Sequence, residues 1–244
     1  MLWYFGIWYS ERETIQEKEI VKMKDTEYKQ YTFDVMPIDL INLYETDEKM
    51  LWKYYPHKDN NCNQAINYLI AKHHIDYAIL HELIQQGNLW QSSYTHTIEF
   101  PVKTERDDLV AVEAVRYDNK GCFRSKEVYG YGFTHLAGNR VTWLIFVKSA
   151  VELLSLLQIK KDLIVHLGCL LISMCGVSPT IVARYKSLYP NAKWCMSFKP
   201  NDLEKQTIEN HFAGVKWALP PEPYSKWNEV VLAETADLYS FPSK

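Results

Sequence analysis

The chain has 244 residues and a formal net charge of −3, with 27 basic and 30 acidic side chains. This length suits one large domain or two small ones, and it is enough to bury a sizeable core. The slightly negative charge excludes a general attraction to nucleic acid, so binding of that kind would need a local basic patch.

The cysteines and the apolar segments predict a cytoplasmic protein with no membrane partner. The five cysteines include no C-x-x-C pair, so the spacing typical of zinc ribbons is absent. An odd number of cysteines, several within apolar runs, is typical of free thiols in a reducing compartment. Residues 1–10 are apolar but lack the basic start and small-residue cleavage site of a signal peptide. The run 163–177 is shorter than the ~20 residues that a membrane helix needs.

The first 60 residues show no clear periodicity, and we interpret them as an N-terminal extension. Beyond them, apolar residues at helical spacing predict two helices between residues 63 and 90. Asp76 is the expected N-cap of the second helix, and Gly87 is its expected stop.

Alternating apolar residues then predict a group of antiparallel strands. The expected strands and hairpin turn, in chain order, are 98–102, 109–117, the turn 118–121 and the returning strand 122–128. Together with the two helices, these strands form a small α+β module that we place at residues 61–135.

After residue 140 the pattern changes to strands that alternate with helices. The expected elements, strand and helix in turn, are 141–147, 149–157, 163–167, 178–188, 193–198 and 202–212. Such alternation predicts a parallel sheet with helices on its faces, and the ligands of such sheets lie at the carboxyl ends of the strands. Lys148 and Lys199 fall at two of these ends.

Several short motifs, in this order and spacing, resemble one known pair of domains. The motifs are NYLIAKHHI (67–75), IQQGNLW (84–90), AVR (114–116), SKEVYGY (125–131), LIFVKSAVELLS (144–155), LISMCGV (171–177) and SKWNEV (225–230). From about residue 54 to 232 the chain resembles plasmid and transposon primase- or relaxase-associated proteins. In these a small domain of unknown function precedes a Toprim domain, the fold that topoisomerases and bacterial primases share.

The resemblance implies an α/β fold, in which a Toprim-like parallel sheet flanked by helices occupies residues 136–244 behind the smaller module. In active members of this family, a glutamate ends the first Toprim strand and an Asp-x-Asp motif ends a later one. These carboxylates hold magnesium, since hard divalent cations prefer oxygen ligands.

The chain departs from the family pattern at the positions of these carboxylates. The glutamate position matches Lys148, and the Asp-x-Asp position matches Lys199-Pro-Asn201, or residues 200–202 with Asp202 as the one remaining acid. The family's tail usually carries an aspartate before Trp-Asn, where this chain has Lys226. An ammonium group beside a divalent cation is repelled. We therefore expect no catalytic residue and no cofactor.

The basic residues at these positions have two interpretations. Lys148, Lys199 and Lys226 could together hold a phosphate where the family holds a metal, or they are ordinary solvated lysines. Arg116 and Arg124, in the expected hairpin, could likewise contact phosphates or belong to an ordinary strand surface.

An active enzyme remains the alternative, and it would need other acids. Glu152, Asp202 and Glu204 could rebuild a magnesium site, although Glu152 is more simply a helix-surface residue or an i,i+4 partner of Lys148. Adjacent histidines such as His73 and His74 point in different directions, which favours helix-end roles over metal binding.

We therefore predict a catalytically inactive, Toprim-like protein of mobile-element origin. It would be an accessory in DNA transfer or replication. Its partner would be nucleic acid, or a replication or transfer protein of a mobile element. The alternatives are a magnesium-dependent nuclease or primase-type enzyme with a rearranged acidic site, and a pure protein-interaction module. The sequence gives no indication of the oligomeric state.

Overall fold

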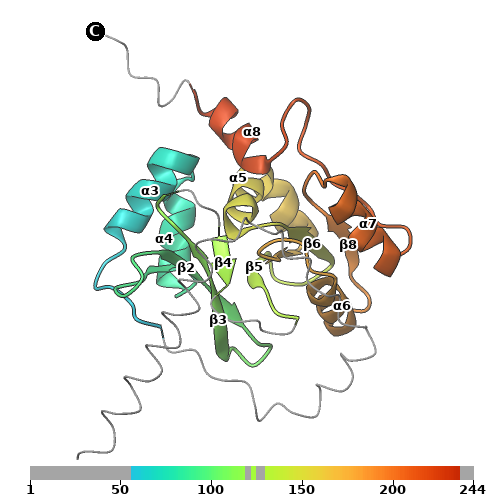
Figure 1. Cartoon of the computed structure of the whole chain (residues 1–244), viewed down its shortest axis with the longest axis horizontal. Coiled ribbons are helices and arrows are strands. Elements are labelled where there is room, and N and C mark those ends of the chain that lie inside the picture. Colours follow the sequence, from blue (N-terminus) through green and yellow to red (C-terminus); the bar gives the residue numbers. More distant parts are fainter. Residues whose placement is uncertain (1–55, 119–121, 125–129, 237–244) are drawn as a thin grey trace, which may run out of the picture. The chain divides into compact units, whose positions relative to one another are not determined.

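The computed structural model describes residues 56–118, 122–124 and 130–236, all within one compact unit of the chain (Figure 1). Most of the expected extension, the tip of the expected hairpin and the returning strand beyond Arg124 lie outside these residues. Over the part of the chain that is described, every helix is too short or too polar to cross a membrane.

The described strands form one continuous sheet in the order β4-β3-β2-β5-β7-β6-β8, with β1 paired to β2. Their bounds are β1 Trp90–Gln91, β2 Ile98–Lys103, β3 Leu109–Val115, β4 Cys122–Arg124, β5 Phe133–Ala137, β6 Trp143–Val147, β7 Cys169–Ser173 and β8 Lys193–Met196. β6 is parallel to both β7 and β8, and the other pairings are antiparallel. The sheet therefore has a parallel part formed by β7, β6 and β8, and a larger antiparallel part formed by the other strands.

Helices cover the parallel half of the sheet on both faces, and Figure 1 shows the sheet between α3 and α4 on one side and α6 and α7 on the other. The bounds are α3 Asn63–His73, α4 Tyr77–Gln85, α5 Ala150–Leu167, α6 Pro179–Leu188, α7 Asp202–His211 and α8 Trp227–Glu234. One apolar core packs α3, α4, α5 and α8 on one face, and a second core packs α6 and α7 on the other. The expected α/β class with a sheet flanked by helices is confirmed.

The two predicted N-terminal helices are confirmed, with the expected signals at their ends. The Asp76 carboxylate accepts a hydrogen bond of 2.8 Å from the backbone N–H of Ala78 at the start of α4. Gly87 follows the end of α4 with a φ of +67°, a left-handed conformation that suits glycine. Leu80 and Leu83 of this helix are fully buried, which attaches the helix pair to the sheet.

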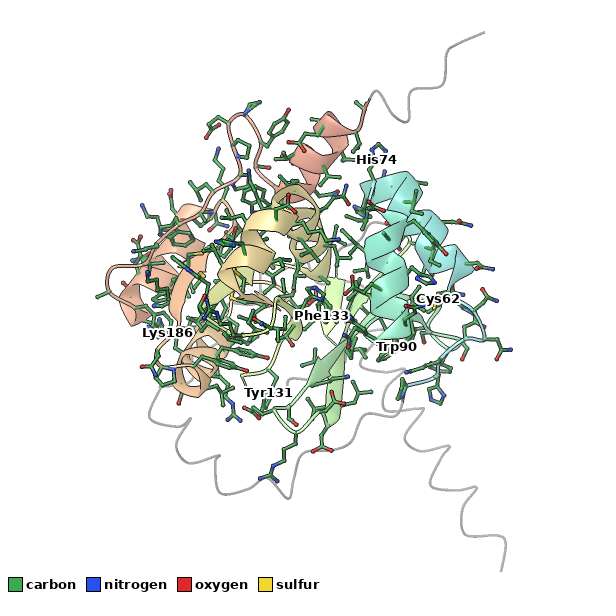
Figure 2. All side chains as sticks on the ribbon, turned by 180° about the vertical axis from the view of Figure 1, so that it is seen from behind. Cys62, His74, Trp90, Tyr131, Phe133 and Lys186 are labelled. Atoms are coloured by element: carbon green, nitrogen blue, oxygen red, sulfur yellow. The ribbon has the colours of Figure 1, made fainter. Side chains whose placement is uncertain are left out.

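The strand β5 joins the two halves of the sheet, and the sequence did not predict it. Phe133 pairs with Val102 of β2 on one side and with Ser173 of β7 on the other. Figure 2 shows Phe133 between the helix pair near Trp90 and the region around Lys186. The preceding residue, Gly132, has no room for a side chain, because a Cβ there would lie 2.1 Å from the carbonyl oxygen of Ser173.

The strand predicted over residues 163–167 is wrong, because α5 continues through Leu167. The helix ends at Gly168, whose φ of +67° makes it a left-handed cap, and the strand begins one residue later at Cys169. The other parallel strands and their helices are confirmed. For example, the Ser178 hydroxyl accepts a hydrogen bond from the N–H of Ile181 at the start of α6.

Candidate anion-binding site

The order β7-β6-β8 places a crevice at the carboxyl ends of β6 and β8. From β6 the chain runs through α5 to β7 on one side, and from β7 it runs through α6 to β8 on the other. In open α/β sheets this change of direction is where ligands bind. A cavity of about 570 Å³ lies there, and we call it the crevice cavity.

Four basic side chains from four separate segments line the crevice cavity. Arg116 follows β3, Lys148 follows β6, Lys199 lies in the loop after β8, and Lys226 immediately precedes α8. The structure thus brings together four of the five residues that the sequence marked for phosphate binding. The side chain of the fifth, Arg124, lies outside the described part of the chain.

Three of these cations form ion pairs with carboxylates. The Lys148 ammonium lies 2.6 Å and 2.7 Å from the two carboxylate oxygens of Glu204. Arg116 pairs with Asp118 at 2.8 Å, and Lys199 pairs with Glu222 at 3.0 Å. The acids Glu204, Asp118 and Glu222 therefore hold three of the four cations that line the crevice cavity.

Glu204 is fixed by the start of α7 as well as by Lys148. Its Oε2 accepts a hydrogen bond of 2.8 Å from the N–H of Asn201, while its own N–H donates to the Asn201 side chain at 2.8 Å. This reciprocal pair is a capping box, which stabilises the first turn of a helix. The cap explains why Glu204 faces the loop after β8, within reach of Lys148.

The interpretation of Glu152 as a surface residue or a partner of Lys148 is wrong. Its side chain is buried, and its carboxylate accepts hydrogen bonds from the N–H groups of Trp227 at 2.6 Å and Asn228 at 3.5 Å. Burial raises the pKa of Glu152, while these N–H donors and the charge of Lys226 oppose the rise. The Glu152 carboxyl thus serves as an internal hydrogen-bond acceptor at the N-terminus of α8.

A second internal acceptor, Glu113, was missed by the sequence prediction. It is fully buried in β3, and its carboxylate accepts hydrogen bonds from the N–H of Ala150 at 2.7 Å and the hydroxyl of Ser173 at 2.5 Å. The N-terminus of α5, a common phosphate position in α/β folds, is therefore already in contact with a carboxylate. A lone acid within the apolar run 109–115 was the only signal for this role.

His73 and Asn228 connect α3 to α8 at the edge of the crevice cavity. The Asn228 amide nitrogen donates to the His73 carbonyl at 2.8 Å and to the Ser155 hydroxyl at 3.1 Å. Its oxygen therefore accepts from Nδ1–H of His73, 2.9 Å away, which leaves Nε2 as an unprotonated acceptor. Burial lowers the pKa of His73, so the imidazole is neutral at pH 7.

The acids expected to rebuild a metal site are not arranged as one. Glu152 and Glu204 both line the crevice cavity, but Glu152 bonds to α8 and Glu204 to Lys148. Within the described residues, which include Asp202, no three His, Cys, Asp or Glu side chains are grouped so that they could hold a metal ion. The Lys148 ammonium bound to the Glu204 carboxylate does not suit Mg²⁺, which needs anionic and neutral oxygen ligands.

Comparison with known proteins gives only distant structural similarity. No protein-family model matches the chain, and no curated protein matches it. Among solved structures it is similar to the primase fragment of the bacteriophage T7 primase-helicase. The identity is 12%, the TM-score is 0.47, and 63% of this chain and 66% of that one are covered.

Two further structures show the same degree of similarity. One is the RNA polymerase domain of Mycobacterium tuberculosis primase DnaG in complex with a double-stranded DNA oligomer with a 6-nucleotide overhang, at 13% identity, TM-score 0.46 and 71% coverage of each chain. The other is bacteriophage T7 lagging-strand DNA polymerase interacting with primase domains of two gp4 subunits bound to an RNA/DNA hybrid and dTTP, at 11% identity and TM-score 0.47. It covers 64% of this chain and 82% of that one.

Proposed function

We propose that this chain is a Toprim-like accessory protein that binds nucleic acid through its phosphate groups and has no metal-dependent activity of its own. The observation that carries the proposal is the gathering of Arg116, Lys148, Lys199 and Lys226 around one cavity at the ligand-binding edge of the sheet. Four bases and two acids line the cavity itself, and two further acids, Asp118 and Glu222, pair with Arg116 and Lys199 from outside this lining. Basic side chains thus gather at one place in a chain whose net charge is −3.

The chemistry of this lining favours phosphate over other ligands. Lysine and arginine side chains are strong donors to phosphate oxygens, and such charge-assisted hydrogen bonds are stronger than neutral ones. Lys148 also lies 5.3 Å from the ring centre of Phe198, which keeps an apolar wall beside the cation. The crevice cavity therefore offers charge for a phosphate and an apolar surface for the sugar or base attached to it.

The resemblance to plasmid- and transposon-encoded proteins supports a mobile-element origin and a role in DNA transfer or replication. In this proposal residues 61–135 and 136–244 are two modules of one binding protein. The partner is nucleic acid, and the ion pair between Lys148 and Glu204 replaces the family's metal.

The test is the salt dependence of binding to a 12-nucleotide single strand, measured by fluorescence anisotropy for the parent and the variants Lys199→Gln and Lys226→Gln. Each lost phosphate contact should reduce the slope of log K against log salt concentration by about 0.7. Lys161→Gln, on the exposed side of α5, is the matched control and should leave the slope unchanged.

Equal slopes in all four proteins would refute phosphate binding in the crevice cavity. Mg²⁺-dependent cleavage or synthesis by the purified protein, abolished by Glu204→Gln, would instead support the alternative of a rearranged active site.

A further inference from the structure

A second, polar hollow lies beside the crevice cavity, and the two share Arg116. This polar hollow has a volume of about 480 Å³. Its described lining consists of Thr95, His96, Thr97, Arg116, Tyr117 and Asp118. The residues come from the turn before β2 and from the end of β3, which are far apart in sequence and adjacent in the sheet.

Two tyrosines and an arginine form the boundary between the hollows. Tyr68 lines the crevice cavity and Tyr117 lines the polar hollow, and their rings meet edge to face with centres 5.1 Å apart. The Tyr68 hydroxyl donates to the Arg116 carbonyl at 3.3 Å. The Arg116 side chain is 51% exposed and is oriented by two hydrogen bonds to Asp118, of 2.8 Å and 3.1 Å.

We propose that the crevice cavity and the polar hollow form one track for single-stranded nucleic acid, which crosses the boundary at Arg116. This inference rests on the proposed function and extends it from a phosphate site to a strand of at least two or three nucleotides. Arg116 contacts the phosphate at the crossing, and the lysines of the crevice cavity contact the phosphates on one side of it.

The different linings of the two hollows give them different roles. Arg116 is the one arginine or lysine in the described lining of the polar hollow, while hydroxyl groups and the His96 ring supply hydrogen-bond donors and acceptors. Such groups suit the edges of bases and sugars better than the charge of phosphates. Volumes of about 570 and 480 Å³ are in the range of small-molecule sites, so each hollow can take a nucleotide.

The aromatic boundary favours a single strand over a duplex. Bases of a single strand are free to stack on tyrosine rings and on arginine, whereas those of a duplex are already stacked and paired. A free mononucleotide would occupy only one of the two hollows. A strand that crosses Arg116 uses both.

The test compares an 8-nucleotide single strand with a nucleoside 5′-monophosphate, using titration calorimetry on the whole chain. His96 has a φ of +50°, a conformation that Asn and Asp tolerate. His96→Asp places a negative charge in the polar hollow, and His96→Asn is its neutral control of the same shape. We expect His96→Asp to bind the longer strand about fivefold more weakly than His96→Asn does, because the carboxylate repels the backbone.

The mononucleotide, whose phosphate is held by the lysines of the crevice cavity, should bind both variants equally, and this also shows that both variants are folded. Equal binding of the longer strand by the two variants would refute the track but leave the phosphate site intact. A duplex of the same length that binds as well as the single strand would also refute it. If neither the single strand nor the mononucleotide showed salt-dependent binding, both the track and the proposed function would be refuted.

Discussion

At the scale of single residues, Glu204 decides how available Lys148 is to a ligand. Its carboxylate holds the ammonium at 2.6 Å and 2.7 Å, and both side chains are partly buried, at 34% and 21% exposure. A phosphate that binds Lys148 must exchange with this carboxylate. Glu204 is therefore an internal competitor for the ligand, which is the opposite of the role that a metal-binding glutamate would have.

Glu204→Gln should strengthen the binding of a single strand by about threefold or more, because it removes a negative charge from the site. Glutamine can keep the capping box with Asn201, since Glu and Gln both serve at this position of a helix. The measurement is the dissociation constant at fixed salt, alongside the melting temperature of the variant.

Glu222→Gln is the comparison for this effect. Glu222 is 79% exposed and pairs with an exposed lysine, so water and salt screen its charge. We expect a smaller gain in affinity than for Glu204→Gln. Weaker binding by Glu204→Gln would contradict the competitor role and would favour a site in which the carboxylate itself is needed.

The residues of the site were more predictable than the contacts that they make. Lys148 and Lys199 could be selected from sequence because each follows a predicted strand. Lys226 could be selected because it stands where the resembled family usually carries an aspartate. Glu113 and Glu152 could not, because their roles depend on helix N-termini that only the folded chain brings to them. An acid within an apolar segment indicates a buried hydrogen-bond acceptor, but the sequence does not indicate which N–H group it contacts.

At the scale of elements, α5 shows why an apolar run is hard to divide. Residues 163–173 are nearly all apolar, and such a run suits a buried helix as well as a buried strand. The stop signal is Gly168, whose position after a histidine-containing last turn is typical of a helix end. This glycine is the sequence signal for the end of α5 and for the start of the strand Cys169–Ser173.

Glu152 connects α5 to α8, and it makes this contact sensitive to pH. Because burial raises its pKa above the ordinary value of 4.5, the folded state binds the proton more tightly than the unfolded state does. The stability that this group contributes is therefore fully present below pH 4.5 and is lost as the pH rises through the folded pKa.

Glu152→Gln should flatten this pH dependence and be at least as stable as the parent at pH 8, because the amide oxygen can still accept from the N–H of Trp227. Glu152→Ala should lose about 1–3 kcal/mol, since it leaves a buried N–H without an acceptor. Urea denaturation at pH 5 and pH 8 measures both effects. If Glu152→Gln were as unstable as Glu152→Ala at pH 8, the charge rather than the acceptor would be what α8 needs.

At the scale of the whole molecule, the sheet runs without a break from β4 to β8 across the place where the sequence changes its pattern. The alternation of short strands before residue 135 and of strands with helices after it predicted two modules. The described residues 133–137 form a strand that pairs with both halves, and the expected boundary falls within it. The pairing partners of a five-residue strand are set by long-range contacts, so the sequence pattern did not reveal them.

Gly132→Ala tests whether the two halves fold as one unit. The added methyl group would lie 2.1 Å from the Ser173 carbonyl oxygen, so β5 must move away from β7. We expect a loss of about 3 kcal/mol in the free energy of unfolding, at the upper end of the usual cost of overpacking. Gly87→Ala is the control, because nothing lies within 4 Å of its added Cβ and only its positive φ is strained, which costs about 1–2 kcal/mol.

Hydrogen exchange read by mass spectrometry distinguishes one cooperative unit from two modules. If the sheet is one unit, peptides from β3 and β7 should lose protection at the same urea concentration in the parent. In Gly132→Ala both should then shift together to lower urea. If instead only the β7 peptides shift and β3 keeps its parent midpoint, residues 61–135 form a module that is stable by itself. In that case the single register pair between Val102 and Phe133 is a contact between domains rather than the centre of one fold.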